Sequence, residues 1–324
     1  MSSLAPHSTS PSRVDVSVIV PAYNVADYIS YMLGSVQGQT LRELEIIVVD
    51  DASSDATAEI VTAHSKADPR VILLRQPVNA GVCEARNKAI ALAQGRWIAM
   101  VDADDWLDES RLATLVEHAT AVDADWIADD QYIIKGPTDP SKRRLLTAER
   151  SDLQPFDLIH LIERDPPEII GYGTLKPLVR RSFLERHGIR FRCGHVRGED
   201  LLYHVDCGIS GARMFLLNQP LYFYRRRPAS LTAIDAIDIL GDLLPQNAAA
   251  SAAASAAGAT SVQLALHHRE TLIRRCLAYR LLLKSLGRGD VTGPCSTLWH
   301  DPALGVFLVQ RLAMAAARRV GVPC

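Results

Sequence analysis

Apolar runs and polar turns alternate in a regular order along the first hundred residues. Four short apolar runs, rich in β-branched residues, lie at 16–20, 44–50, 71–76 and 97–102, and amphipathic stretches separate them. Continuous apolar runs of this length are typical of strands that are buried on both faces, and the stretches between them suit crossover helices. The alternation predicts an α/β fold with a doubly wound, mostly parallel sheet.

The pattern is less regular between the fourth run and residue 232. It predicts a helix over 110–121, a strand over 124–134, a helix after Glu199–Asp200 and a last strand over 213–232. These elements continue the sheet and its helices, so we assign them to the same domain.

Composition divides the chain into four parts. Residues 1–13 are rich in Ser and Pro, and we expect them to be disordered. The predicted elements fill one domain at 14–232. The low-complexity stretch 233–261 is interpreted as an Ala/Ser-rich linker, with helical alanines as the alternative. The last part, 262–324, interleaves apolar and basic residues at helical spacing and is predicted to be a helical extension.

Charge and cysteine content narrow the class of protein. The formal net charge of −2 gives no general attraction to nucleic acid, so we expect no nucleic-acid partner. The six cysteines form no CxxC pair, which fits reduced thiols better than a disulfide framework. The N-terminus lacks the apolar core of a signal peptide, and no apolar run has the length of a bilayer span. We therefore expect a cytoplasmic protein, either free or at the inner face of the plasma membrane.

The densest polar cluster contains three carboxylates and follows the fourth apolar run. Asp102, Asp104 and Asp105 stand within the sequence "DADD". A turn or a helix cap accounts for a single Asp, but three together need a counter-charge. Sheets of the predicted kind bind ligands at the carboxyl ends of their strands, which is where this cluster falls. The acids are therefore predicted to belong to a binding site.

Four kinds of site use acids at a strand end. A two-component receiver needs them after its first strand, and a haloacid-dehalogenase-type phosphatase needs DxDxT, which "DADDWL" lacks. A Rossmann dehydrogenase needs G-x-G-x-x-G after its first strand, and the sequence has neither this motif there nor a P-loop. The fourth is a nucleotide-sugar site with a DxD motif. In extended backbone Asp102 and Asp104 point to the same side, where they can share Mg²⁺ or Mn²⁺.

Several stretches besides the DxD motif occur in a specific order. They are "VSVIVPAYNVADYI", "LEIIVVDDASSDAT", "NAGVCEARNKAI", "GRWIAMVDADD" and "GED". In this order they resemble family 2 glycosyltransferases of the GT-A fold, and the resemblance extends over about 14 to 232. The segments "PLYFYRRRPASLT" and "DDASSDAT" resemble more narrowly the bacterial exopolysaccharide enzymes of the succinoglycan type.

The resemblance implies where the nucleotide binds. It places Pro21 and Tyr23 at the base, with ring stacking as the role of Tyr23 and plain packing as the alternative. It makes Asp51 the residue that accepts a hydrogen bond from a uracil ring, with Asp50 in support. It also places Arg86 near the base or the phosphates, although a helix-surface salt bridge is almost as good an interpretation.

The resemblance also assigns the acids of the DxD motif and the general base. Asp102 contacts ribose and assists the metal, Asp104 is the direct metal ligand, and Asp105 supports them from behind. Asp200, with Glu199 beside it, is the base that deprotonates an acceptor hydroxyl. Arg225–Arg227 either approach the diphosphate or form a solvated face.

These roles imply an inverting, metal-dependent glycosyltransferase. Its partners are a nucleotide-sugar donor, UDP-linked by default, and a glycan or lipid-linked glycan acceptor of a bacterial surface or secreted polysaccharide. The alternatives are a sugar nucleotidyltransferase and a catalytically degenerate scaffold of a polysaccharide assembly complex. For 262–324 two interpretations stay open: packing on the core or a second subunit, or peripheral contact with an anionic membrane.

Overall fold

The chain folds into two compact units. The computed structural model describes residues 14–146, 152–167, 170–194, 197–226, 235–288 and 305–307. The first unit consists of the described residues of Met1–Asp157, Thr174–Gly194 and Tyr203–Arg226, and the second of those of Leu158–Gly173, His195–Leu202 and Arg227–Cys324. The predicted disordered segment 1–13 lies outside the described residues.

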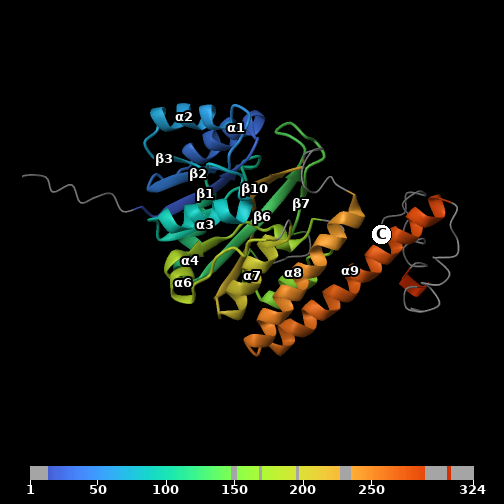
Figure 1. Ribbon diagram of the computed structural model, residues 1–324. Coiled ribbons are helices and arrows are strands. Elements are labelled where there is room, and N and C mark those ends of the chain that lie inside the picture. Colours follow the sequence, from blue (N-terminus) through green and yellow to red (C-terminus); the bar gives the residue numbers. More distant parts are fainter. Residues whose placement is uncertain are drawn as a thin grey trace, which may run out of the picture. The chain divides into compact units, whose positions relative to one another are not determined.

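Strands and helices alternate through the first hundred residues, as predicted. In order they are β1 (Val16–Ala22), α1 (Ala26–Gln37), β2 (Leu44–Asp50), α2 (Thr57–Ala67), β3 (Val71–Arg75), α3 (Val82–Leu92) and β4 (Trp97–Met100). β1 pairs in parallel with β2 and β4, and β2 pairs in parallel with β3. Figure 1 shows α1 and α2 on one side of these strands and α3 on the other. The doubly wound α/β fold is confirmed.

Burial explains why these runs become strands and helices. Every residue of β2 and of β4 is buried, as expected for strands that helices cover on both faces. In α1 the buried residues recur every three or four positions, which puts them on one face of the helix. They are Ile29, Met32, Leu33 and Val36.

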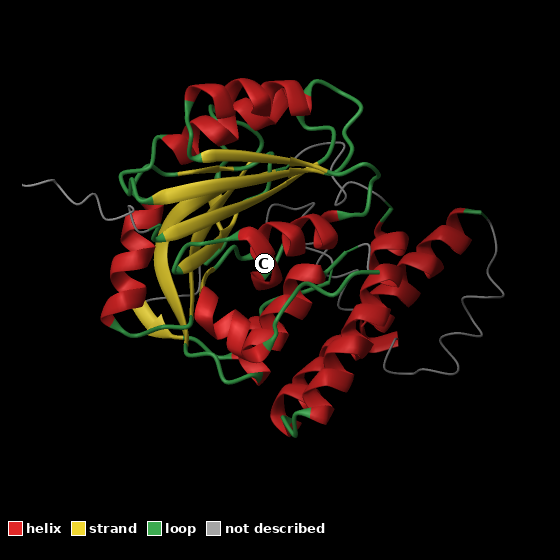
Figure 2. Cartoon of the chain, turned by 60° about the vertical axis from the view of Figure 1, so that its left-hand side comes forward, coloured by secondary structure: helices red, strands yellow, loops and turns green. Residues whose placement is uncertain are grey.

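The rest of the first unit extends this sheet. Its elements are β5 (Trp106–Leu107), α4 (Arg111–Ala121), β6 (Trp126–Ile134), β7 (Arg143–Arg144), β8 (Leu153–Pro155), β9 (Leu178–Arg180), α6 (Arg181–His187), most of α7 (Glu199–Ile209) and β10 (Met214–Arg225). The strand order along the sheet is β3-β2-β1-β4-β9-β6-β10-β5. β9 runs antiparallel to both of its neighbours, whereas β10 is parallel to β6. Figure 2 shows these strands as one twisted sheet.

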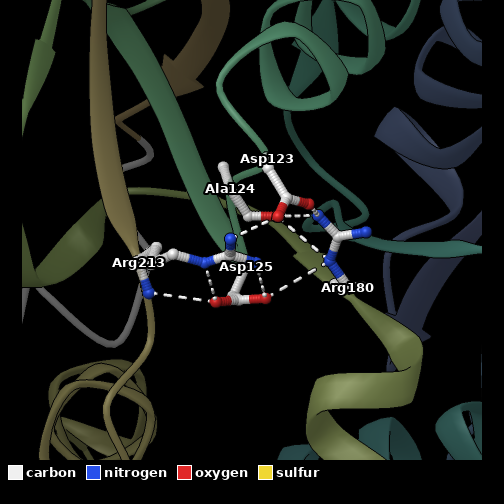
Figure 3. A network of polar contacts seen from close by, with 5 residues as sticks. All are labelled: Asp123, Ala124, Asp125, Arg180 and Arg213. Atoms are coloured by element: carbon white, nitrogen blue, oxygen red, sulfur yellow. Dashed lines mark hydrogen bonds and ion pairs between the residues drawn. The ribbon is translucent and has the colours of Figure 1, made fainter.

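A network of ion pairs joins three strands at the amino end of β6 (Figure 3). Arg213, just before β10, places its Nε 2.9 Å from Asp125 Oδ2 and also pairs with Asp123. Arg180, the last residue of β9, donates to Asp123 Oδ1 at 2.8 Å and lies 3.3 Å from Asp125 Oδ1. It also donates to the Ala124 carbonyl oxygen at 2.5 Å. The network therefore fixes the ends of β9, β6 and β10 against one another.

The second unit is helical. Its described elements are α5 (Leu158–Glu163), most of a 3₁₀ turn (Tyr172–Thr174), the first turn of α7, α8 (Ala236–Ala256) and α9 (Thr260–Gly287). α8 and α9 pack side by side as a helical hairpin (Figure 2). Their shared core contains Leu240, Leu243, Ile273 and Cys276.

Two predicted segments differ from what the structure contains. Residues 236–256, expected to be part of a linker at 233–261, form helix α8, so the alternative of helical alanines is confirmed there. Alanine has the highest helix propensity, and α9 provides a surface on which α8 packs. Moreover, 158–173 and 195–202, expected within a single domain at 14–232, belong to the helical unit. The extension predicted at 262–324 is helical through α9 to Gly287, and most of the remainder lies outside the described residues.

Candidate functional site

Three strands of the first unit end next to one another in the sheet. In the pairing of β1 with β2, Ala22 lies opposite Asp50, and β4 pairs with the other side of β1. The polar clusters at the carboxyl ends of these strands, at 21–24, 50–55 and 102–105, therefore share one edge of the sheet. In doubly wound sheets this carboxyl edge is the usual place of ligand binding.

The counter-charge that the acid cluster requires comes from two buried cations. Arg86 Nη2, from α3, lies 2.9 Å from Asp102 Oδ1, and Lys176 Nζ lies 2.9 Å from Asp102 Oδ2. The Arg86 and Lys176 side chains are only 2% and 3% exposed, while Asp102 is 26% exposed. Each oxygen of the Asp102 carboxylate therefore has its own cation. The alternative of a helix-surface salt bridge is wrong for Arg86, because its side chain is buried, and its place near the base or the phosphates stays a prediction.

These two cations keep Asp102 ionised. Burial by itself raises the pKa of the Asp102 carboxyl, but the charges of Lys176 and Arg86 and their hydrogen bonds lower it more, so that the net shift is downward. The trio carries one negative and two positive charges, and its excess positive charge lies beside the carboxylate of Asp104 in the same loop. An anionic group of a ligand is attracted to such a place.

Lys176 is the site residue that sequence reasoning missed. It stands alone in the apolar stretch "GTLKPLV", without a motif around it. The available signal was indirect, since a lysine predicted inside a buried stretch needs an acidic partner. Its backbone is held by Arg111, which donates to the Lys176 carbonyl oxygen at 2.5 Å and forms a buried ion pair with Asp129 at 2.7 Å.

A second polar group holds Asp105. The Tyr222 hydroxyl donates to Asp105 Oδ2 at 2.6 Å, and the Arg225 backbone N–H donates to Oδ1 at 2.7 Å. Burial raises the pKa of the Asp105 carboxyl well above its usual range, and the nearby charges of Asp104 and Asp102 add to the rise. Asp105 is thus a buried acid whose hydrogen bonds connect the loop 102–105 to β10.

Arg225, the last residue of β10, contacts the same loop. Its Nε donates to the Asp104 carbonyl oxygen at 2.8 Å. Its guanidinium carbon lies 5.0 Å from the centroid of the Tyr28 ring and 4.8 Å from that of Trp106, distances that suit cation–π contacts. Of the two interpretations of Arg225–Arg227, the solvated face does not describe Arg225 but fits Arg226, which is exposed. Arg227 lies outside the described residues.

Asp51 is buried and accepts three hydrogen bonds. Oδ1 accepts from Gln76 Nε2 at 2.6 Å and from the Ala80 N–H at 2.8 Å, while Oδ2 accepts from the Gly81 N–H at 2.7 Å. Asp51 therefore fixes the turn that precedes α3. A carboxylate offers about four acceptor positions, and the three donors occupy three of those of Asp51.

Pro21 is the next-to-last residue of β1, and Tyr23 is the first residue of the turn that follows it. Tyr23 is 50% exposed, so plain packing in the core does not explain this ring. The turn is fixed to the one after β2, because the Asn24 N–H donates to Ser53 Oγ at 3.0 Å and Asn24 Oδ1 accepts from the Ser54 N–H at 2.8 Å. The arrangement presents an aromatic face at the carboxyl edge.

The acid loop supplies oxygen ligands of the kind that Mg²⁺ and Mn²⁺ prefer. Asp104 is partly exposed, whereas both Asp102 oxygens already contact cations. Among the described residues no three His, Cys, Asp or Glu side chains form a group that could hold a metal ion.

Asp200 lies in the first turn of α7, within the second unit. Glu199 precedes it, and both side chains are partly exposed. Acidic residues are favoured in a helical first turn by the helix dipole. Asp200, Tyr23 and Asp104 are at least partly exposed, Asp102 and Arg86 form an ion pair, and Asp51 is buried. The roles predicted for these residues stay predictions.

The comparisons with known proteins decide the family. A model of the family "Glycosyl transferase family 2" matches residues 17–198. The chain belongs to glycosyl transferase family 2. It is 31% identical over 308 residues to the succinoglycan biosynthesis protein ExoO of Rhizobium meliloti (strain 1021), covering 94% of this chain and 86% of ExoO. It is 32% identical to the uncharacterized glycosyltransferase EpsJ of Bacillus subtilis (strain 168), covering 68% of this chain and 63% of EpsJ.

Solved structures confirm the fold of this glycosyltransferase. Residues 1–349 of TarS from S. aureus, in complex with UDP-GlcNAc, match with a TM-score of 0.58 at 22% identity, over 70% of this chain and 64% of that one. The mannosyltransferase PcManGT from Pyrobaculum calidifontis, in complex with GDP-Man and Mn²⁺, matches with a TM-score of 0.59 at 20% identity, over 94% and 86%. The expected GT-A fold is confirmed, and the alternative of a sugar nucleotidyltransferase is not supported.

Proposed function

We propose that this glycosyltransferase transfers a sugar from a nucleotide-sugar donor, UDP-linked by default, to a bacterial surface or secreted polysaccharide. The observation that carries the proposal is the acid loop at the carboxyl end of β4, where Asp102 lies between Arg86 and Lys176. ExoO, whose name refers to succinoglycan biosynthesis, supports the polysaccharide. The matching structures with UDP-GlcNAc and GDP-Man support the donor class.

In this proposal each part of the site has its own task. Tyr23 stacks on the base, with Pro21 beside it, and Asp51 accepts a hydrogen bond from the base. Asp102 binds the ribose hydroxyls, and Arg86 and Lys176 keep its carboxylate ionised and oriented. Anchored in this way, the nucleoside places its diphosphate beside the acid loop.

Asp104 is the proposed ligand of Mg²⁺ or Mn²⁺, with Asp102 assisting. When bound, the metal neutralises charge on the departing diphosphate. The Mn²⁺ in PcManGT supports the use of a divalent cation, and the carboxylate oxygens of the loop fit either ion.

The proposed reaction is a single displacement. The Asp200 carboxylate takes the proton of an acceptor hydroxyl while the acceptor oxygen bonds to the anomeric carbon. The bond between that carbon and the diphosphate breaks with its electron pair going to the diphosphate. One in-line step inverts the configuration, so that an α-linked donor gives a β-glycoside. General-base catalysis of this kind contributes about 10²–10⁴-fold.

A screen of nucleotide sugars tests the proposal. The protein is incubated with UDP-, GDP- and dTDP-sugars in the presence of Mn²⁺ or Mg²⁺, and the released nucleoside diphosphate is measured. We expect metal-dependent turnover of at least one UDP-sugar. Turnover of a UDP-sugar that EDTA leaves unchanged would contradict metal dependence, and turnover of GDP-sugars alone would overturn the UDP assignment.

We further propose that α9 makes peripheral contact with an anionic membrane at the cytoplasmic face, where a lipid-linked glycan acceptor would be found. Leu281, Leu283 and Leu286 are more than 40% exposed, and Lys284 lies among them. Exposed leucines beside basic residues suit an interfacial helix. No helix of the described chain is both long and apolar enough to cross a bilayer.

A further inference from the structure

The segment that carries Asp200 rests on helix α8. Arg197 and Gly198 directly precede α7, and each contacts a different residue of α8. All of these residues belong to the second unit. The base of the proposed reaction is therefore attached to the C-terminal helices, which sequence reasoning left without a catalytic task.

The first attachment is an ion pair between Arg197 and Asp242. The guanidinium of Arg197 donates to Asp242 Oδ2, and the Arg197 side chain is 10% exposed. A buried charge needs its partner, because an unpaired cation in such surroundings is costly. Arg197 is thereby held three residues before Asp200.

The second attachment is a close approach of backbone to side chain. Gly198 has a φ of +75°, and a Cβ at this position would collide with the amide oxygen of Gln246. Gln246 is 3% exposed, so it has little room to move away. Asp242 and Gln246 are four residues apart and therefore lie on the same face of α8. Arg197 and Gly198 thus meet one continuous surface of this helix.

Helix α8 is itself fixed within the second unit. Asn247 is fully buried and donates to the Leu266 carbonyl oxygen of α9 at 2.9 Å. On α9, Arg269 is buried and pairs with Asp165 at 2.7 Å, which anchors the loop after α5 to the same hairpin. The hairpin therefore contacts two separate loops of the chain, the one after α5 and the one before α7.

We propose that Arg197 and Gly198 are positioning residues for Asp200, and that the α8–α9 hairpin is the support that sets the place of the base. This inference rests on the proposed role of Asp200. The physical reason is that proton transfer needs the base within hydrogen-bond reach of the acceptor hydroxyl. A displacement of about 1 Å can lower the rate about 10²-fold.

Charge-swap variants test the ion pair. The reaction is hydrolysis of the nucleotide sugar that the screen identifies, with water as acceptor. We expect Arg197→Ala and Asp242→Ala each to lower kcat by about 10- to 100-fold, with the KM for donor near wild type. The swapped pair, Arg197→Asp with Asp242→Arg, should recover most of the lost activity. Arg274→Ala is the matched control, because Arg274 is 65% exposed and pairs with Glu270 on the surface of α9.

Hydrogen exchange gives a readout that is independent of turnover. Amides at 197–202 should exchange faster in Arg197→Ala than in wild type, while those of β1 and β2 should not change. Two results would contradict, respectively, the positioning role of Arg197 and the role of Asp200 as the base. If Asp200→Asn abolishes hydrolysis but Arg197→Ala and Asp242→Ala keep wild-type kcat, the positioning inference is wrong, while the assignment of Asp200 as the base is retained. If Asp200→Asn keeps more than a tenth of wild-type activity, the role of Asp200 is wrong.

Discussion

At the scale of the residue, the Asp102 carboxylate depends on Lys176, whose ammonium is almost fully buried against it. Replacing Lys176 by Met removes this cation but keeps most of the side-chain volume. We expect nucleoside diphosphate binding to weaken by roughly 10- to 100-fold, because a hydrogen bond to a charged group contributes about 1.5–3 kcal/mol. Titration calorimetry with UDP and Mn²⁺ measures the change.

The control for Lys176→Met is the same substitution at Lys66, an exposed residue of α2. It should leave UDP binding unchanged. Wild-type affinity in Lys176→Met, with the protein folded as judged by its thermal midpoint, would mean that Arg86 alone suffices to hold Asp102.

Asp102 could be predicted from the sequence and Lys176 could not, because the two residues stand in different sequence contexts. The acids come directly after an apolar run, so the end of a strand and its polar cluster can be read together. Lys176 reaches the same point from 74 residues further along the chain, and it stands just before β9, a three-residue strand. Short strands and contacts between distant segments leave no local periodicity, so only tertiary structure reveals them.

At the scale of the element, the network around Asp125 holds β6, β9 and β10 at the edge opposite to the acid loop. Asp125→Asn should therefore lower the free energy of unfolding without affecting UDP binding. Hydrogen bonds between charged partners of this kind are worth about 1.5–3 kcal/mol. Urea denaturation of the variant and the wild type at pH 7 measures the loss.

The effect of Asp125→Asn should depend on pH. Burial raises the pKa of the Asp125 carboxyl, but hydrogen bonds and charges of Arg213 and Arg180 outweigh it and lower the pKa below its ordinary value. A carboxyl whose pKa is lowered by folding contributes its full stabilisation at pH values above its ordinary pKa of about 3.9. This contribution is lost as the pH falls from that value through the lower pKa of the folded state. The difference between wild type and Asp125→Asn should thus be full at pH 7 and smaller near pH 3. A difference that grows on acidification would contradict the ion-pair network.

The secondary structure of β1 to β4 is easier to predict from the sequence than that of the Ala-rich segment that forms α8. β1 to β4 follow from runs of buried residues bounded by polar turns, and the structure places them where the runs lie. Helix α8 was harder to predict because small residues without a clear apolar stripe suit a linker as well as a helix. Its helical state depends on packing against α9, which a local pattern does not contain.

At the scale of the whole molecule, the proposed membrane contact makes a prediction for the full chain. Co-sedimentation with vesicles that contain anionic lipid should deplete the protein from the supernatant at low salt. High salt should release it, because the attraction of basic residues to an anionic surface is screened. Leu281→Ser with Leu286→Ser should weaken the binding, whereas Leu92→Ser, at an exposed leucine of α3, should not. Full recovery of the wild type in the supernatant at low salt would leave α9 as a packing element.

The central claim is that a metal bound by Asp104 links the protein to its nucleotide. Calorimetric titration of wild type and Asp104→Ala with UDP, each with and without Mn²⁺, tests it most directly. Asp104 lies on a loop and is partly exposed, so the variant should keep the thermal midpoint of the wild type. We expect Mn²⁺ to strengthen UDP binding to the wild type and to have no effect on Asp104→Ala. Equal affinity of the wild type for UDP with and without Mn²⁺ would contradict the claim.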